Sequence, residues 1–369
     1  MKLPKNNTLW LALLILLNAS SSIFAGIWSA VATTGSPPPA AYSATEVWTG
    51  SEMIVWGGTL SNSPSLVMTN QGSRYNPVSK VWTAMTTTSA PSARGEHRMV
   101  WTGSRVVVWG GLSGSSALDT GAVYNPANNT WTAISTTGAP SARSAHSMVW
   151  TGTHVIVWGG LNTAGTSLGD GAKYNPTTNT WSVISSSGAP SVRHEASTVW
   201  TGSKMIVWGG RSSQFLNTGG IYDFASDSWS AMTTVNAPIE AWRVKAVWTG
   251  TEMVVFCGYW ENTVSAGHYN PTTNTWSAIG NTGIPSSRAD HTIVWTGSEM
   301  LVWGGWNGGY LGDGASYNPA TKIWEVITNT NAPSARSSHV AVWTGDELVV
   351  WGGSVGGQAN QIFQNGGVL

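Results

Sequence analysis

The sequence predicts an all-β protein of seven four-stranded blades, a β-propeller, and three observations support this fold. The tripeptide Trp-Thr-Gly recurs seven times, at intervals of 47 to 53 residues. An aromatic residue follows eight residues after each of these tryptophans and, with one exception at Cys257-Gly258, a glycine pair follows that aromatic. The 369 residues include 44 Gly, 16 Pro and 24 Trp, as expected of short strands joined by tight turns. A repeat of about 50 residues is typical of a propeller blade.

The first two strands of each repeat, here named strands a and b, flank the tripeptide. Strand a is the apolar segment that ends at Trp-Thr-Gly, and Thr-Gly forms the a–b hairpin turn because glycine adopts positive φ freely. Strand b is a run such as 106–109, Val-Val-Val-Trp, which is apolar at consecutive positions and should be buried on both faces. The tripeptides begin at Trp48, Trp101, Trp150, Trp200, Trp248, Trp295 and Trp343.

The last two strands of each repeat, strands c and d, carry a Tyr and a Trp seven residues apart. Asn-Pro usually follows the Tyr and should open the c–d turn. The six pairs are Tyr75 and Trp82, Tyr124 and Trp131, Tyr174 and Trp181, Tyr222 and Trp229, Tyr269 and Trp276, and Tyr317 and Trp324.

The seventh repeat lacks strand d, and the N-terminus should supply it. The C-terminal segment 361–364 places Phe363 at the expected strand c Tyr position, and no Trp follows. Segment 27–30, Ile-Trp-Ser-Ala, matches segment 275–278, Thr-Trp-Ser-Ala. We therefore expect the strand around Trp28 to be the outer strand of blade 7, next to the strand around Phe363, which closes the ring and covers a sheet edge.

These motifs resemble the kelch repeat. The segment 174–181, Tyr-Asn-Pro-Thr-Thr-Asn-Thr-Trp, is similar to the most recognisable stretch of that family, and so is Pro-Ser-Ala-Arg-x-x-His before strand a. The resemblance, to a secreted kelch protein of the bacterial type, covers essentially all of residues 26–369. It implies a propeller that serves as a binding platform, a cytoskeletal adaptor or an enzyme. The copper site and Tyr–Cys cross-link of galactose-oxidase-like kelch enzymes are not visible, and no motif maps onto the sialate mutarotases.

Residues 1–25 are predicted to be a secretory signal peptide. Lys2 and Lys5 form a positive start, residues 9–17 are an unbroken apolar run, and small residues lead to Ala25. Nine apolar residues are too few to span a bilayer. We expect cleavage after Ala25, one propeller domain over residues 26–369, and a secreted or periplasmic location.

Composition excludes several other classes of protein. The chain has 17 basic and 17 acidic residues, 9% in all, against about 25% in an ordinary soluble domain. It therefore lacks the basic excess of a nucleic-acid binder. One cysteine excludes an intrachain disulfide and a multi-cysteine zinc site. We expect no cofactor, no metal, no nucleic acid, no membrane span and a monomer.

The candidate site rests on the aromatic residues that the repeat does not require. These lie in d–a loops (Tyr42, Trp242) or b–c loops (Phe215, Tyr259, Trp260, Trp306, Tyr310). Both loop classes lie on one rim of an antiparallel propeller, and all but Tyr42 belong to blades 4 to 6. They form either an aromatic binding shelf or a self-covering loop cluster. The predicted ligand-binding residues are Trp242, Arg243, Tyr259, Trp260, Glu261, Trp306, Tyr310 and Arg288.

A second feature is a repeated Arg in the d–a loop, followed three positions later by His in four repeats. The arginines either bond carbonyls of neighbouring blades, as scaffold, or form an anion-binding channel mouth. Metal ligation by the histidines would require four residues from separate blades to converge on one ion. The residues are Arg94, Arg143, Arg193, Arg288 and Arg336, with His97, His146, His291 and His339.

Two functions remain open at this point. One is an exported binding module that holds an extracellular glycan, protein or peptide across the loops of blades 4 to 6, without catalysis. The other is a carbohydrate-active enzyme, a mutarotase, lyase or hydrolase, with Glu240, Glu261, Asp290 or His291 as acid or base. No nucleophile elbow, phosphate loop or zinc motif occurs.

Overall fold

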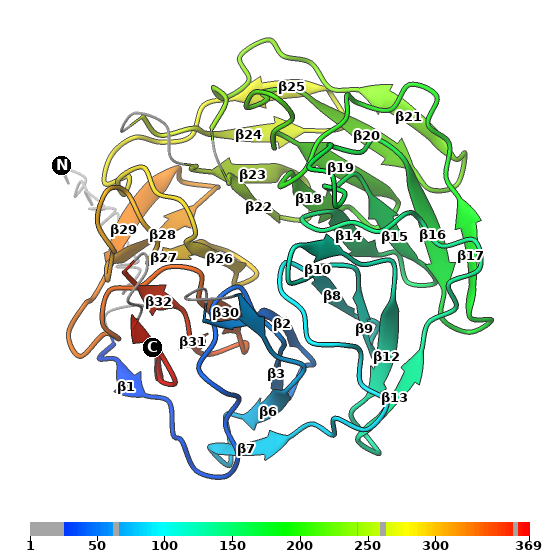
Figure 1. The fold of residues 1–369 in the computed structure, drawn as a ribbon. Coiled ribbons are helices and arrows are strands. Elements are labelled where there is room, and N and C mark those ends of the chain that lie inside the picture. The colour runs from blue at the N-terminus through cyan, green and yellow to red at the C-terminus, as the bar shows by residue number, and fades with distance from the viewer. Residues whose placement is uncertain (1–25, 62–65, 242, 259–262, 357–360) are drawn as a thin grey trace, which may run out of the picture.

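The computed structural model describes residues 26–61, 66–241, 243–258, 263–356 and 361–369, which form seven four-stranded antiparallel sheets arranged in a ring (Figure 1). This is the predicted propeller. None of the described residues form a helix, so there is no helix in this part of the chain that could cross a membrane.

The blades follow one another along the chain, and the strand bounds repeat closely. Blade 1 holds β2 (Thr45–Trp48), β3 (Met53–Trp56), β6 (Gly72–Asn76) and β7 (Val81–Ala84). Blade 2 holds β8 (Arg98–Trp101), β9 (Val106–Trp109), β12 (Gly121–Asn125) and β13 (Thr130–Ala133). Blade 3 holds β14 (Ser147–Trp150), β15 (Val155–Trp158), β16 (Gly171–Asn175) and β17 (Thr180–Val183). Blade 4 holds β18 (Ser197–Trp200), β19 (Lys204–Trp208), β20 (Gly219–Asp223) and β21 (Ser228–Ala231).

The remaining blades have the same pattern, and three b–c loops add short hairpins. Blade 5 holds β22 (Lys245–Trp248), β23 (Met253–Phe256), β24 (Ala266–Asn270) and β25 (Thr275–Ser277). Blade 6 holds β26 (Thr292–Trp295), β27 (Met300–Trp303), β28 (Gly314–Asn318) and β29 (Ile323–Ile327). Blade 7 holds β30 (Val340–Trp343), β31 (Leu348–Trp351), β34 (Gly366–Val368) and β1 (Ser29–Ala30). The hairpins pair β4 (Thr59–Ser61) with β5 (Val67–Met68), β10 (Leu112–Ser113) with β11 (Ser116–Ala117), and β32 (Ser354–Val355) with β33 (Gln361–Ile362).

The N-terminal strand closes the ring, as predicted. Strand β1 pairs with β34 through Ser29↔Val368 and Ala30↔Gly367, so one blade combines the two ends of the chain. Trp28, next to this strand, is 1% exposed and packs against Trp303 of blade 6 at 5.5 Å between ring centroids. Its indole Nε1 donates a hydrogen bond to the carbonyl of Thr328 at 2.7 Å. Blade 7 is thereby tied to blade 6 by residues far apart in sequence.

The placement of Phe363 at the strand c Tyr position was wrong. Strand c of blade 7 is β34, and the residue opposite Leu348, where other blades have Tyr, is Leu369. Phe363 lies in the b–c loop instead, buried beneath the guanidinium of Arg336 at 4.1 Å from Cζ to the ring centroid. The b–c loop of blade 7 is longer than the repeat suggests, and an aromatic residue alone did not reveal where that loop ends.

The core is a ring of aromatic contacts between blades. The strand d Trp of each blade packs against the aromatic residue that ends strand b of the preceding blade, and Trp131 on Trp56 at 5.5 Å is one example. Each strand d indole also donates to a backbone carbonyl just after strand d of that preceding blade. These bonds join Trp28 to Thr328, Trp82 to Ala32, Trp131 to Thr86, Trp181 to Ser135, Trp229 to Ser185, Trp276 to Thr233 and Trp324 to Gly280.

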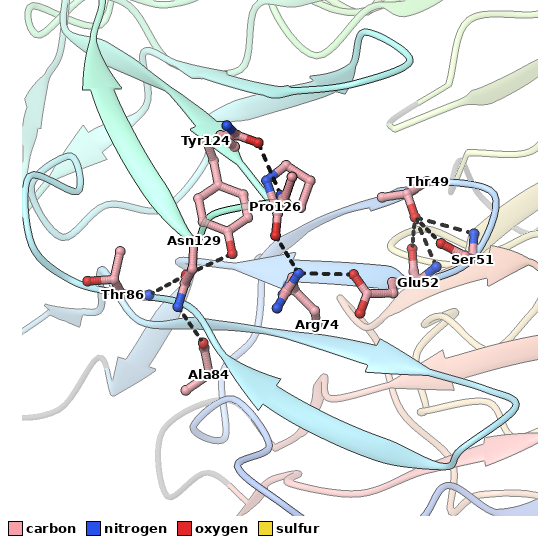
Figure 2. A network of polar contacts seen from close by, with 11 residues as sticks. Thr49, Ser51, Glu52, Arg74, Ala84, Thr86, Tyr124, Pro126 and Asn129 are labelled. Atoms are coloured by element: carbon pink, nitrogen blue, oxygen red, sulfur yellow. Dashed lines mark hydrogen bonds and ion pairs between the residues drawn. The ribbon is translucent and has the colours of Figure 1, made fainter.

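The c–d turns add a polar latch between blades on the face that carries the a–b hairpins (Figure 2). The Tyr124 hydroxyl donates to Oδ1 of Asn129, which also accepts the backbone N–H of Thr86 in blade 1. Arg74 of blade 1 donates from Nη1 to Glu52 and to the carbonyl of Pro126 in blade 2. Asn129 has φ of 54°, in the left-handed region that Asn tolerates better than most residues. Asn179, Asp227 and Asn274 repeat the latch in the following three blades.

Candidate functional site

A central channel runs between the seven strand a segments and encloses a cavity of about 390 Å³. Every blade contributes to its wall with the residues that lead into and begin strand a. A volume of this size lies within the range of small-molecule sites. The cavity is therefore large enough to admit a small molecule.

The mouth of the channel is formed by one residue from each blade, and all seven have positive φ of 50–56° although none is glycine. This conformation is uncommon outside glycine, and here it turns the chain from the d–a loop into strand a. Neighbouring members are joined by backbone hydrogen bonds, such as Glu195 N–H to Ala145 at 2.9 Å and Ser338 N–H to Asp290 at 2.9 Å. The seven mouth residues are Ser43, Glu96, Ala145, Glu195, Arg243, Asp290 and Ser338.

Arg243, one of the predicted ligand-binding residues, is held between two carboxylates at this mouth. Its Nε donates to Glu195 at 3.1 Å and its Nη1 donates to Asp290. Burial alone would lower the pKa of Arg243, but the two carboxylates raise it above its usual value. Burial alone would raise the pKa of Glu195, but Arg243 holds it below its usual value. The guanidinium therefore stays charged and fixed across blades 4, 5 and 6.

In four blades, the residue that follows the mouth residue is a buried His in the channel wall. The rings stack edge-on against the aromatic residue that ends strand b of the preceding blade, as His97 does on Trp56 at 5.0 Å. A Cβ at Gly57 would lie 2.6 Å from the His97 ring, which explains the glycine after that aromatic. Burial lowers the pKa of His97 and His339 to about 3, and those of His146 and His291 well below their usual value. All four imidazoles are thus neutral near pH 7.

Two cations follow in the next layer. Arg98 and Lys245 occupy positions where the other blades have Thr, Ser or Val. Arg98 donates from Nε to the carbonyl of His146 at 3.0 Å. Burial lowers the pKa of Lys245 although its side chain is open to the channel, and Arg98 lowers it further. Glu46 lies one residue deeper, and burial raises its pKa to about 7 despite both cations.

The cavity lining holds a large share of the few charged residues of this chain. The charged residues of its lining are Glu46, Glu96, Arg98, Glu195, Arg243, Lys245 and Asp290, seven of the 34 Lys, Arg, Asp and Glu residues. Charge that is partly withdrawn from solvent is costly to a fold and often marks a functional site. Of these seven, Arg243 was predicted for the site and Asp290 for the alternative enzyme. Of the other five, Arg98 and Lys245 could have been found from one signal, a charged residue at a repeat position that is small or hydroxylated in most other blades.

The d–a and b–c loops surround the mouth on one face, as predicted. In six blades, the residue before the mouth residue pairs with the residue that follows the Gly-Gly of strand b. The pairs are Tyr42 with Thr59, Gly95 with Leu112, Ser144 with Leu161, His194 with Arg211, Ala289 with Trp306 and Ser337 with Ser354. In these six blades the loops therefore form a collar around the mouth of the channel.

The described aromatic candidates lie in this collar. Trp306 pairs with Ala289 and Tyr310, and both aromatic residues are partly exposed. In blade 4, Arg211 is exposed and lies over the ring of Phe215 at 5.9 Å from Cζ to the centroid. Trp242, Tyr259, Trp260 and Glu261 lie outside the described residues.

The repeated arginines are scaffold, and Arg288 belongs with them. Each is at most 1% exposed, and its three guanidinium nitrogens all donate to protein oxygens; Arg288 bonds Gly304, Asp313 and Ser286. The bonded carbonyls belong to the same blade, not to neighbouring blades as expected. Instead, the backbone carbonyl of the Arg accepts an N–H of the preceding blade, as Arg94 does from Gly58 at 2.9 Å. The guanidinium of Arg288 is not open to a ligand.

The four residues considered as acid or base do not form one site in the described chain. Glu240 is exposed on its loop, Asp290 is paired with Arg243, and His291 is 2% exposed. Glu261 lies outside the described residues. Among the residues that the structure describes, no cluster of three or more His, Cys, Asp or Glu side chains could hold a metal ion.

The ring of repeated blades defines a β-propeller, and comparison with known families agrees. The family model described as the KLHDC2/KLHL20/DRC7 Kelch-repeats domain matches residues 14–193 and 145–353. The two matches span most of the chain, which therefore belongs to the kelch-repeat β-propellers, a fold of protein-interaction modules. The comparison with curated proteins found no match.

Proposed function

We propose that this kelch propeller is an exported binding module that holds a segment of another polypeptide on the collar face, centred on the mouth of the channel. The observation that carries the proposal is the gathering of seven charged side chains in the channel cavity that this face surrounds. Charges of both signs, three of them held by the ion pairs of Arg243 with Glu195 and Asp290, suit the mixed charges and backbone groups of a peptide.

The partly exposed aromatic residues of the collar support the same face. Trp306 and Tyr310 in blade 6 and Phe215 beneath Arg211 in blade 4 offer flat apolar surfaces beside polar groups. Such surfaces are typical of binding hot spots. Trp242 and Trp260 join this proposal on their sequence positions alone. The same surfaces would also stack on a sugar ring, so a glycan remains an outcome of the test.

Export is part of the proposal and rests on residues 1–25. Their positive start, apolar run and small-residue cleavage site support transport out of the cytoplasm. The test is N-terminal sequencing of the protein recovered from the periplasm or medium of an expressing bacterium. A mature N-terminus at Gly26 is expected, and a retained Met1 in an exclusively cytoplasmic protein would overturn this part.

Ligand binding is tested by probing peptide and glycan arrays with purified residues 26–369. We expect peptides to be captured, and Arg211→Ala and Trp260→Ala to reduce capture by tenfold or more, which is about 1.4 kcal/mol. Arg105→Ala is the matched control, because Arg105 lies at an a–b tip and donates to the carbonyl of the adjacent Ser104. Equal loss in the control, or capture of glycans alone, would contradict the proposal.

A further inference from the structure

Charge is layered along the channel. The mouth residues Glu96, Glu195 and Asp290 are acidic, and one cation, Arg243, lies among them. Two residues further along their strands, Arg98 and Lys245 form a cationic layer. An extended chain rises about 3.3 Å per residue, so the two layers lie about 7 Å apart along the axis.

The cationic layer makes few direct contacts with protein acceptors, and Glu46 and the mouth carboxylates Glu96, Glu195 and Asp290 act on it only through space. Among the described residues, the Arg98 guanidinium makes one hydrogen bond, from Nε to the His146 carbonyl. The Lys245 ammonium makes no hydrogen bond or ion pair within the described chain. Each cation lies close enough to Glu46 to lower the pKa of that carboxyl, but burial opposes them and raises it to about 7. Near neutrality, Glu46 is therefore partly protonated, so within its own layer the two cations outweigh the one carboxyl group.

Buried imidazoles line the wall between the two layers. His146 and His291 are 1% and 2% exposed, and their ring nitrogens are buried. These nitrogens are screened from the channel as well as from bulk solvent, because the rings stack edge-on against the aromatic residue that ends strand b of the preceding blade. The imidazoles therefore form the packed wall behind the charged layers and are not ligand contacts.

We propose that the channel binds an amphoteric group, with a cationic nitrogen at the acidic mouth and a carboxylate about 7 Å deeper, between Arg98 and Lys245. This inference rests on the proposed function, because it takes the collar face as the entry side. A carboxylate in the cationic layer relieves the repulsion between the two cations. An ammonium at the mouth meets the net negative charge of three carboxylates and one guanidinium. A ligand with one charge satisfies one layer only.

The test uses small probes on the purified propeller, with binding measured by calorimetry and NMR. The probe 6-aminohexanoate carries its two charges about as far apart as the two layers. Hexanoate and hexylamine carry one of these charges each, and 3-aminopropanoate carries both too close together. We expect 6-aminohexanoate to bind about tenfold or more tightly than each of the other three. Equal binding of hexanoate, or no binding of 6-aminohexanoate at any concentration up to about 50 mM, would overturn the proposal.

Variants locate the site. Lys245→Met should lose 6-aminohexanoate binding and keep the melting temperature within a few degrees, since no bond within the described chain is broken. Lys204→Met is the control, because Lys204 lies on the opposite face, 3.7 Å from Asp223. Unchanged binding in Lys245→Met contradicts the proposal. If peptides are captured on arrays but 6-aminohexanoate does not bind, the channel inference fails and the proposed function stands. If neither binds, both fail.

Discussion

Nε2 of His268 in blade 5 lies 2.7 Å from the hydroxyl of Tyr317 in blade 6, and its Nδ1 lies 3.0 Å from Glu252. In blades 2 to 5, the strand c Tyr bonds an Asn or Asp of its own c–d turn. Blade 6 has Lys322 at that turn position, with the same positive φ, so no local acceptor exists. The His of the neighbouring blade takes its place, so the partner of the Tyr hydroxyl changes from a residue of its own blade to a residue of the preceding blade.

This relationship predicts a non-additive pair of substitutions. His268→Ala leaves the buried Tyr317 hydroxyl without its partner and should lower the free energy of unfolding by about 1–3 kcal/mol. Tyr317→Phe should cost less, and adding it to His268→Ala should restore part of the loss, because no unpaired hydroxyl remains. Chemical denaturation of the two single variants and the double variant measures the coupling. Strictly additive effects would show that the contact contributes nothing.

Ring closure predicts a global effect from a small deletion. Removing residues 26–32 takes away β1 and Trp28, leaves the Trp303 face bare and exposes the edge of β34. Loss of a buried Trp alone costs about 3–5 kcal/mol, so the melting temperature of the whole ring should fall sharply. Trp28→Ala should produce most of this fall. An unchanged melting temperature after the deletion would count against closure through these residues.

We expect the scaffold arginines to stabilise the fold and to take no part in ligand binding. Arg143 donates to Gly159, Asp170 and Ser141 through all three guanidinium nitrogens and is fully buried. Arg143→Ala should lower the free energy of unfolding by about 1–3 kcal/mol, since it leaves buried carbonyls unpaired. Arg105→Ala, at an a–b tip, should change it by less than about 0.5 kcal/mol. A loss of ligand binding in Arg143→Ala at a temperature where it is fully folded would contradict the scaffold role.

The raised pKa of Glu46 predicts a dependence of stability on pH. Burial lifts this pKa from 4.5 to about 7, while Lys245 and Arg98 oppose the rise. The folded state thus holds its proton more tightly than the unfolded chain, and this group makes stability fall as pH rises from about 4.5 to about 7. Glu46→Gln removes the fall, so its melting temperature should gain on the parent through that window and stay higher above pH 7.

The four neutral histidines act in the opposite direction. Their lowered pKa values make stability rise with pH up to about 6.5 in both proteins. Subtracting the two melting temperatures at each pH cancels this contribution and isolates Glu46. A difference that is constant from pH 4 to pH 8 would show that Glu46 ionises normally.

The repeat allowed the scaffold to be predicted from the sequence, but it did not reveal the charged residues of the channel. Seven copies in register revealed the strands, the blade count and the N-terminal closure, because each copy repeats the same packing requirement. Phe363 was misplaced because blade 7 departs from the repeat there, with Leu369 at the Tyr position. Arg98 and Lys245 were missed because their importance comes from convergence of separate blades on one axis. Sequence spacing does not show which side chains of different blades face one cavity.

The distinction between scaffold and ligand aromatics gives the last prediction. Trp276 is 4% exposed, packs on Trp208 and Tyr269 at 5.1 and 5.0 Å, and donates to Thr233. Trp276→Ala should cost about 3–5 kcal/mol of stability, since it opens a cavity and breaks the contact with blade 4.

Trp306 lies partly exposed in the collar, so Trp306→Ala should cost much less stability. If Trp306 is a hot spot, its loss should weaken peptide capture by about 2 kcal/mol or more. Thermal melts and the peptide array compare the two variants, and capture is measured below both melting temperatures. A Trp306→Ala protein that melts far below the parent yet captures peptide normally would make this tryptophan a loop-packing residue and move the binding surface elsewhere on the face.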